Sequence, residues 1–529
     1  MSRRHPSPTT AGAAAPAALR RAPARLRLVP PDSPRRQAVK ALGVAPIGEP
    51  VLIGLSPADA RHHLHVPGPT GTGKSTLLLN LALADARAGR GLAVFDPKGD
   101  LVRDLLDRLP PGVAGRLVLI DPDERQAPPA LNLFDLGSDP ETVADQLVGV
   151  MAKVWAQYWG PRTDDLARHA VLTLAHQPDA TLADLPLLLA DAAYRRWVLA
   201  WVRRRADPVE YGELAAFWAW YDELTPAQAS VQAGPLLSKL RAVLSRRFAA
   251  QLFGVGASTF RLTEVLDGGA LLVRLPPTLG EDTVRLVGSL LLAALLGAAN
   301  GRADLPEADR LDASLVLDEA HTFLHLPVGV DNALATARAL HVSLVLAHQH
   351  LGQLSANMFA ALDANARNKV FFSLPPKDAR DLAHHMAPYF EPEDLMRRDA
   401  YGIVCRLVID GADSEPFSLH TRPAPPVVPG RADVLRAAAR ARGLSTSERA
   451  ALAQARRLGP AARTGPTNPT GNGNGPAVNP TQEPTDPTGP TGGRVPPAGP
   501  TSGPAGPGVQ PPPAARVRPP TPRKRRKRP

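Results

Sequence analysis

A phosphate-binding motif is the clearest chemical feature of the chain. The residues GPTGTGKS (68–75) match G-x-x-x-x-G-K-[ST] at every position, follow an apolar segment and open a helical pattern. Glycines let backbone N–H groups surround phosphate oxygens, and the amino end of a helix favours their negative charge. Lys74 would contact the β- and γ-phosphates, and Ser75 would bind Mg²⁺. The sequence therefore predicts an ATP and Mg²⁺ site whose nucleotide-binding residues are Gly68, Pro69, Thr70, Gly71, Thr72, Gly73, Lys74, Ser75 and Thr76.

A second acidic site follows further along the chain. The segment SLVLDEAH (314–321) is an apolar strand pattern that ends in Asp318 and Glu319. Asp318 would hold Mg²⁺ together with Ser75, and Glu319 would polarise the water that attacks the γ-phosphate. Surface acids at an ordinary strand end are the alternative interpretation. The letters DEAH also occur in one class of helicase, but the Q-x-x-G-R-x-G-R motif of that class has no match in this sequence.

Two more polar residues are candidates for catalysis. The strand pattern HVSLVLAHQ (341–349) ends in Gln349, whose amide would sense the γ-phosphate. Arg338 stands 11 residues earlier in a helical pattern, and a cation near the γ-phosphate stabilises transition-state charge. Because one helix end and one strand separate them, we expect both near the sheet edge that carries the nucleotide. A solvated helix arginine and an ordinary strand-end glutamine are the alternatives.

One charged segment has an open role. VFDPKGD (94–100) places Asp96 and Lys98 at the end of a strand pattern. These side chains would either line the nucleotide site or fix the loop beside it, and the sequence does not distinguish the two roles.

The elements that must position these residues alternate between strand and helix patterns. Such alternation predicts an α/β fold with a mostly parallel sheet covered by helices. The stretch 140–262 has helical patterns almost throughout and is predicted to be an inserted all-helical domain. The predicted parts are a disordered basic arm (1–45), the first part of a P-loop core (46–139), the helical insertion (140–262), the second part of the core (263–424), a linker and helix (425–458), and a disordered Pro/Gly/Thr-rich basic tail (459–529).

These motifs together resemble the HerA/FtsK superfamily of P-loop ATPases, and most of all the type IV secretion coupling proteins of the TraG/TraD kind. The resemblance covers roughly residues 50–420. Its carriers are GPTGTGKST (68–76), VFDPKGD (94–100), LVLDEAH (315–321), ARAL to LAHQHLGQL (337–354) and NARNKVFFSLPPKDARDLA (365–383).

The resemblance implies a RecA-like core and a ring, usually a homo-hexamer, with ATP bound between subunits and DNA in the channel. It implies that Lys74 and Ser75 bind nucleotide and Mg²⁺, and that Asp318 and Glu319 coordinate and hydrolyse. By the same resemblance Gln349 senses the γ-phosphate, and Arg338 reaches the ATP of the neighbouring subunit. Relaxase or secretion-channel proteins are the implied partners. Many coupling proteins begin with two transmembrane helices, whereas the sequence predicts no membrane span for this chain.

Charge is concentrated at the two ends of the sequence. The chain has 529 residues and a net charge of +11, but residues 1–40 carry +8, residues 491–529 carry +9, and the rest sums to −6. The basic ends favour non-specific attraction to DNA. The single cysteine, Cys405, excludes a disulfide framework and any Cys-based metal cluster. The longest apolar run (286–299) is short for a membrane span and is interpreted as a core helix. We expect a cytoplasmic protein, and two options stay open: a soluble form, or recruitment to the inner face of the cell membrane by a partner.

The sequence thus predicts an ATP-dependent DNA translocase similar to conjugative coupling proteins. Two alternatives stay open: a HerA-like DNA-repair motor, and an ATP-switched scaffold that recruits protein substrates to a secretion channel. All six tryptophans lie within 140–262. They are either a stacking platform for single-stranded DNA or the core of a small helical domain.

Overall fold

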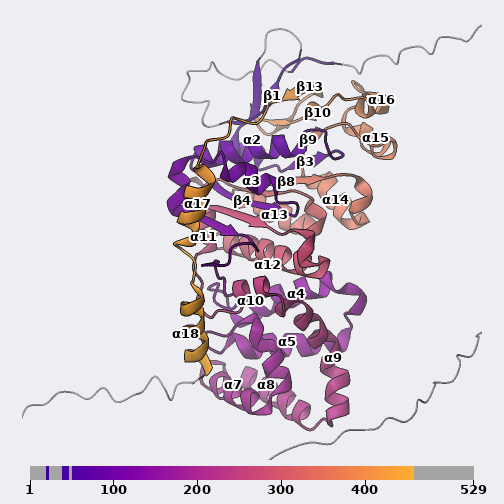
Figure 1. Cartoon of the computed structure of the whole chain (residues 1–529). Helices are drawn as coiled ribbons and strands as arrows, with labels where there is room; N and C mark the ends of the chain where they lie inside the picture. Colours follow the sequence, from indigo (N-terminus) through magenta and orange to yellow (C-terminus); the bar gives the residue numbers. More distant parts are fainter. Residues whose placement is uncertain (1–18, 23–38, 47–50, 458–529) are drawn as a thin grey trace, which may run out of the picture. The chain divides into compact units, whose positions relative to one another are not determined.

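The structure is a computed structural model that describes residues 19–22, 39–46 and 51–457 (Figure 1). The predictions for most of the basic arm and for the tail 459–529 concern residues outside these ranges.

An 11-stranded sheet forms the centre of the fold, in the order β2-β1-β13-β10-β9-β3-β8-β7-β4-β6-β5. The strands from β9 to β5 in this order pair in parallel, and β2, β1, β13 and β10 pair antiparallel. The prediction of an α/β fold with a mostly parallel sheet is therefore confirmed. The strands are β1 (Lys40–Val44), β2 (Leu52–Leu55), β3 (Leu64–Pro67), β4 (Gly91–Asp96), β5 (Leu117–Ile120), β6 (Ala270–Arg274), β7 (Ala313–Leu317), β8 (Val342–His348), β9 (Asn368–Phe371), β10 (Gly402–Arg406) and β13 (Phe417–Thr421), and β11 (Val408–Ile409) and β12 (Ala412–Asp413) form a small separate sheet.

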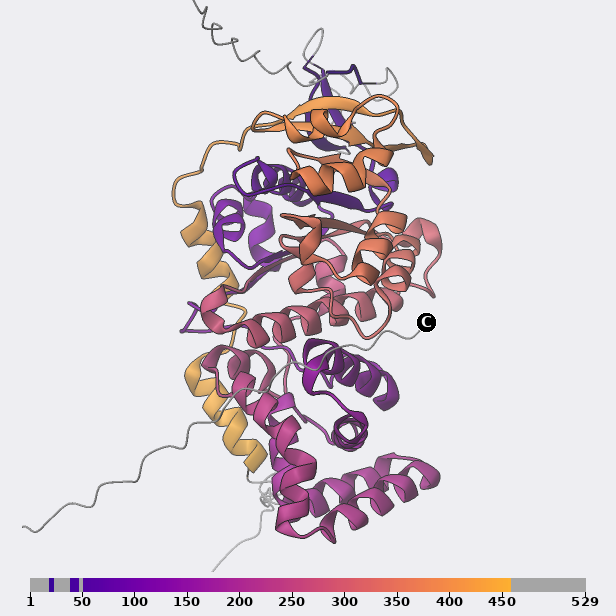
Figure 2. The ribbon, with the colours of Figure 1, turned by 90° about the vertical axis from the view of Figure 1, so that its right-hand side faces the viewer.

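Helices cover both faces of the parallel part (Figures 1 and 2). In β7, Leu315 and Leu317 face one hydrophobic cluster and Val316 faces the other, as the twofold alternation of a strand requires. The first cluster includes α12 (Glu281–Asn300) and α13 (Val330–Ala339), and the second includes α2 (Lys74–Arg87) and α3 (Asp100–Leu106). Burial on both faces explains why these strands are almost uniformly apolar.

The structure corrects the prediction for residues 40–44. They were expected to belong to the disordered arm 1–45, but they form β1, which pairs antiparallel with β2 and β13. Leu42 is fully buried, and the Lys40 ammonium lies 3.1 Å from Asp85 and 3.2 Å from the Ser343 hydroxyl. A strand of five residues beside an Arg/Pro/Ala-rich segment is too short to stand out by composition, and long-range pairing stabilises it.

Between β5 and β6 the chain is helical. The helices are α4 (Pro140–Val154), α5 (Pro161–Ala175), α6 (Leu185–Ala190), α7 (Ala192–Arg205), α8 (Pro208–Asp222), α9 (Pro226–Leu244), α10 (Arg247–Phe253) and α11 (Leu262–Leu266). Proline begins four of them, because the first helical residue needs no N–H partner. Trp155 and Trp218 are buried in this core, whereas Trp201 lies under Arg204 and Arg205, whose guanidinium carbons are 5.7 and 5.8 Å from its ring centroid.

Within the described ranges, α12 is the one helix long and apolar enough to cross a membrane, with a mean hydropathy of 1.6 in its most apolar window. That window is 72% buried, and α12 packs against α4 and α11. Its burial agrees with the interpretation of 286–299 as a core helix.

Two helices end the described part of the chain, and the first of them packs beside β5 at one edge of the sheet. The linker and helix expected over 425–458 contain two helices, α17 (Arg431–Arg440) and α18 (Thr446–Arg457). Gly443 lies between them, where a Cβ would come within 1.8 Å of the Ala127 carbonyl oxygen, so the chain turns where only glycine fits. Arg436 and Arg440 join α17 to Asp121 and Glu124 beyond β5.

Candidate active site

Four neighbouring parallel strands bring the predicted chemistry together. The strands β3, β8, β7 and β4 are adjacent in the sheet and run in the same direction. The phosphate-binding loop follows β3, Gln349 follows β8, Asp318 and Glu319 follow β7, and Lys98 follows β4. Because the carboxyl ends of parallel strands share one edge, residues from four distant parts of the sequence meet there.

The phosphate-binding loop has the backbone shape that an anion needs. Gly73 precedes α2 with a φ of 108°, and no side chain caps the first N–H groups of this helix. A Cβ at Gly73 would lie 2.7 Å from the Tyr401 ring, and one at Gly68 would lie 2.7 Å from the Phe372 Cβ. Glycine at both positions therefore lets the loop pass close to its neighbours and leaves N–H groups available to phosphate oxygens.

Lys74 is bound to its own loop. The buried ammonium group donates to the Gly68 carbonyl and, at 3.1 Å, to the Pro69 carbonyl. Burial lowers the pKa of Lys74, while the nearby carboxylates of Asp318 and Glu319 raise it. Phosphate oxygens would replace the two carbonyls as partners and compensate the charge more fully.

Glu319 is the centre of the site. It accepts hydrogen bonds from Lys98 Nζ at 2.6 Å, Gln349 Nε2 at 2.7 Å and Gln353 Nε2 at 3.3 Å. Burial alone would raise the pKa of Glu319, but the bonds from Lys98 and Gln349 lower it below its ordinary value, which keeps the group ionised. Glu319 also has a left-handed φ of 53°, uncommon for a residue with a side chain, and such conformations cluster at functional sites.

The two open roles of the DPKGD segment belong to different residues. Asp96 accepts from the backbone N–H groups of Lys98 (2.8 Å), Gly99 (2.7 Å) and Val102 (3.0 Å), so it fixes the loop and the start of α3. Lys98 lines the site through Glu319. Gln353, to which the sequence analysis assigned no role, also accepts from the Gln349 N–H at 2.8 Å. The Q-x-x-x-Q spacing was the available indication, because a short 3-10 turn, η9 (Leu351–Gln353), brings the two amides together.

Asp318 has the features of a cation ligand. Its Oδ1 is buried and has no hydrogen-bond partner in the described part of the chain. Burial is the main cause that raises the pKa of Asp318 to about 6, with a smaller contribution from Glu319. An unpaired buried carboxylate oxygen beside a P-loop fits a hard divalent cation, and the exposed Ser75 hydroxyl supplies a second oxygen. The residues present therefore fit Mg²⁺.

Arg338 lies at the opposite edge of the sheet, which corrects the expectation that it shares an edge with Gln349. Arg338 belongs to α13, which precedes β8, whereas Gln349 follows β8. A strand of seven residues carries the chain about 20 Å across the sheet, so its two ends cannot serve one site. Arg338 lines a cavity of about 600 Å³ together with Arg61, His62, Arg310 and Arg367. No described residue forms an ion pair with Arg338.

Comparison with known proteins gives structural matches only. No protein-family model and no curated protein matches the chain. The bacterial conjugative coupling protein TrwBΔN70 in a trigonal, sulphate-bound form aligns with a TM-score of 0.54 at 15% identity, over 80% of this chain and 98% of that one.

Two nucleotide complexes of the same plasmid coupling protein match as well. The complex with ADP and Mg²⁺ has a TM-score of 0.53 at 15% identity, covering 77% of this chain and 95% of TrwB. The complex with the non-hydrolysable ATP analogue ADPNP has a TM-score of 0.51 at 18% identity, covering 79% and 97%. The predicted RecA-like P-loop fold is confirmed: the chain has the fold of the conjugative coupling protein TrwB.

Proposed function

We propose that the chain is an ATP hydrolase that uses the released energy to translocate DNA, in the manner of a conjugative coupling protein. The observation that supports hydrolysis most directly is Glu319, a buried ionised carboxylate that Lys98 and Gln349 hold at the carboxyl edge of the sheet, beside the phosphate-binding loop. A carboxylate kept ionised and oriented is what the polarisation of an attacking water requires.

Binding begins at the loop. The uncapped N–H groups at the start of α2 receive the phosphates, and Lys74 exchanges the Gly68 and Pro69 carbonyls for phosphate oxygens. Mg²⁺, held by Ser75 and Asp318, would neutralise charge on the phosphates and supply Lewis-acid stabilisation. Ionised Asp318 thereby gains the partner that its buried oxygen lacks among the described residues.

Gln349 connects binding to hydrolysis. Its amide nitrogen donates to Glu319, while its amide oxygen accepts from the Thr70 hydroxyl of the phosphate-binding loop at 3.3 Å. A γ-phosphate that engages the loop competes for Gln349 and so changes the hydrogen bonding of Glu319. The base therefore becomes available to water when nucleotide is in place.

The ring and the DNA belong to the same proposal. Arg338 is too far across the sheet to serve its own phosphate-binding loop, and it lies without an ion-pair partner among the described residues in an arginine-lined cavity. This position suits contact with nucleotide bound to a neighbouring subunit, as in a homo-hexamer. The fold shared with TrwB supports a DNA substrate. We place the protein in the cytoplasm, where ATP is available, with recruitment to the membrane through relaxase or secretion-channel partners.

The test is the ATPase rate of Glu319→Gln with and without DNA. The variant keeps Lys74, Ser75 and Asp318, so nucleotide affinity should stay close to wild type, while turnover falls by about 10²–10⁴. Lys74→Ala should instead weaken nucleotide binding itself. Wild-type turnover by Glu319→Gln would refute the proposed role of this residue.

DNA separates the motor from the scaffold alternative. A translocase should hydrolyse ATP faster with DNA and should displace a third strand from a triplex ahead of it, with Glu319→Gln as the inactive control. A scaffold with switch-like hydrolysis should show neither effect. ATPase activity that is indifferent to DNA would leave hydrolysis intact and reject translocation.

A further inference from the structure

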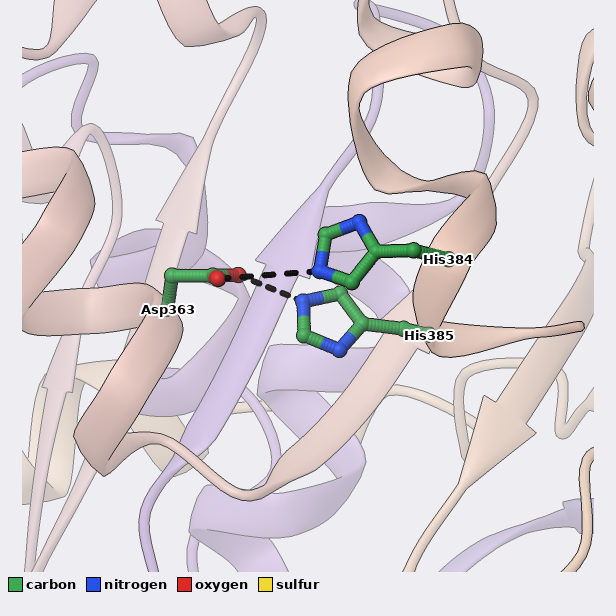
Figure 3. A group of neighbouring side chains, drawn as sticks. All are labelled: Asp363, His384 and His385. Carbon is green, nitrogen blue, oxygen red and sulfur yellow. Dashed lines mark hydrogen bonds and ion pairs between the residues drawn. The ribbon is translucent and has the colours of Figure 1, made fainter.

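Three metal-binding side chains converge outside the nucleotide site. Asp363 lies near the end of α14 (Ala356–Asn365), and His384 and His385 lie in the 3-10 turn η10 (Ala383–His385), which follows α15 (Pro376–Leu382). Figure 3 shows both imidazole rings pointing at the Asp363 carboxylate from the same side. One ligand atom of each residue lies within 4.8 Å of the other two.

The distances leave room for an ion on one side of the carboxylate. His385 Nε2 lies 2.5 Å from Asp363 Oδ1, a hydrogen bond, whereas His384 Nε2 lies 3.7 Å from Oδ2. Adjacent tetrahedral ligands on a cation with metal–ligand distances of about 2.0–2.2 Å stand about as far apart as His384 Nε2 and Asp363 Oδ2 do. The shorter hydrogen bond between His385 and Asp363 would have to open when the ion binds.

The tautomer of His384 decides whether the ring nitrogen that faces Asp363 Oδ2 carries a proton. Its Nδ1 donates to the Asp381 carbonyl at 2.9 Å, so in the neutral ring Nε2 carries a lone pair. That lone pair faces Asp363 Oδ2, so a cation between the two atoms would be bound by both. The backbone bond also orients the ring, as second-shell bonds to metal-binding histidines do.

A hydrogen bond joins the other two ligands. His385 Nε2 donates to Asp363 Oδ1 in the apo protein, so this nitrogen would give up its proton when it binds a metal ion. The Asp363 carboxylate accepts this hydrogen bond and also lies beside the Lys369 ammonium group. Lys369 Nζ lies 2.7 Å from the Asp363 carbonyl and 3.4 Å from Oδ1, which leaves Oδ2 open toward His384.

We propose that Asp363, His384 and His385 form a Zn²⁺ site. Two imidazole nitrogens and one carboxylate oxygen match zinc rather than Mg²⁺ or Ca²⁺, which prefer oxygen ligands. The His384 side chain is 58% exposed, so a water molecule can complete a tetrahedral set from the solvent side. The ion would join α14 to the α15–η10 segment, two pieces of chain that β9 separates in the sequence. This inference does not depend on the proposed ATPase.

The experiment uses the untagged full chain after chelator treatment, with Mg²⁺ in excess. Calorimetric titration with ZnCl₂ should show one saturable site per chain, and Zn²⁺ should raise the melting temperature, because a ligand that binds only the folded state stabilises it. Cobalt(II) in place of zinc should give the strong visible absorption of a tetrahedral site. Loss of even an outer-shell partner costs about 10–100-fold in metal affinity, so His384→Ala and Asp363→Asn should each lose at least that much.

His420→Ala is the matched control, because it removes an exposed histidine from β13 and should leave zinc affinity unchanged. His384 is itself largely exposed, so its replacement should leave the apo protein folded, which circular dichroism verifies. If His384→Ala binds Zn²⁺ as tightly as wild type, or if the wild-type protein shows no saturable binding, the three residues form an ion pair and the zinc site is rejected.

Discussion

Glu319 depends on Lys98 for its charge state, and this dependence is testable at the residue scale. The 2.6 Å bond from Lys98 lowers the pKa of Glu319, against the burial that would raise it. In Lys98→Met the carboxylate should therefore take up a proton at higher pH than in the wild type. The acid limb of the ATPase pH profile should move to higher pH, with Lys98→Arg restoring much of the wild-type profile. An unmoved acid limb with reduced turnover would mean that Lys98 has only a steric role.

Buried histidines make the fold sensitive to acid. His63 accepts from the Leu344 N–H at 3.0 Å and lies 2.8 Å from the Leu334 carbonyl, and burial lowers its pKa to about 4. The unfolded chain binds this proton from about pH 6.5 downward, so stability present above pH 6.5 is lost as the pH falls through 4. The full effect is about 3 kcal/mol.

Denaturant titrations of wild type and His63→Gln at several pH values measure this effect. The variant should show a shallower loss of stability between pH 6.5 and 4, while the exposed His420→Gln should follow the wild type. Equal slopes for His63→Gln and wild type would assign the acid sensitivity to other buried groups.

The sequence predicted the residues that follow apolar strands, but it did not predict contacts that depend on the three-dimensional arrangement of turns and side chains. Lys74, Asp318, Glu319 and Gln349 were placed correctly at one edge because each follows an apolar strand, and parallel strands end together. Gln353 had no assigned role because its contact with Glu319 depends on a short turn rather than on a strand end. The DPKGD segment was found, but the division of labour between Asp96 and Lys98 needs distances.

At the scale of elements, the direction of β8 decides what Arg338 can do. Arg338 was expected beside Gln349, yet seven residues of strand separate the two edges. The error came from counting sequence positions without following the chain across the sheet. The strand β1 was missed for a related reason, because its five residues are stabilised by antiparallel pairing with β2 and with β13, which lies far along the sequence.

The position of Arg338 leads to a mixing experiment. Arg338→Ala should bind ATP almost normally and lose hydrolysis by up to about 10³–10⁵ if it acts on a neighbour's nucleotide. Lys74→Ala should also be inactive. A ring that contains both variants has some interfaces with an intact loop facing an intact arginine, and those interfaces should hydrolyse ATP.

The measurement is ATPase rate against mixing ratio, with ring formation confirmed by light scattering. Mixtures of Glu319→Gln with Lys74→Ala are the control. Each of these changes disables the site of its own subunit, so no site in the mixed ring is intact and the ATPase rate should stay at background. A flat background rate in rings shown to contain both Arg338→Ala and Lys74→Ala would remove Arg338 from the proposed role.

At the scale of the whole molecule, charge separates the ends of the chain from its middle. Residues 491–529 carry nine basic residues and no acidic one. Deleting them should lower DNA affinity and flatten its salt dependence, because each engaged cation contributes about 0.7–0.9 to the slope of log affinity against log salt. DNA-free ATPase activity should not change, since the site residues lie between 68 and 353.

Filter binding at several salt concentrations, for the full chain and the truncated chain, measures this slope. A variant that keeps the length of the tail but replaces RKRRKR (523–528) with glutamines separates charge from length. Equal slopes in all three proteins would show that the tail does not contact DNA.

The strand β8 has a consequence for kinetics. Its amino end adjoins the arginine-lined cavity and its carboxyl end carries Gln349, so one rigid segment touches two proposed nucleotide environments. A displacement of β8 caused by nucleotide in the neighbouring subunit would reach Gln349 together with the paired strands β3 and β7, whose carboxyl ends carry the phosphate-binding loop and Asp318. Turnover in one subunit would then depend on occupancy of the next, and the rate should rise sigmoidally with ATP concentration. Arg338→Lys, which keeps a cation but alters its reach, should make that curve hyperbolic.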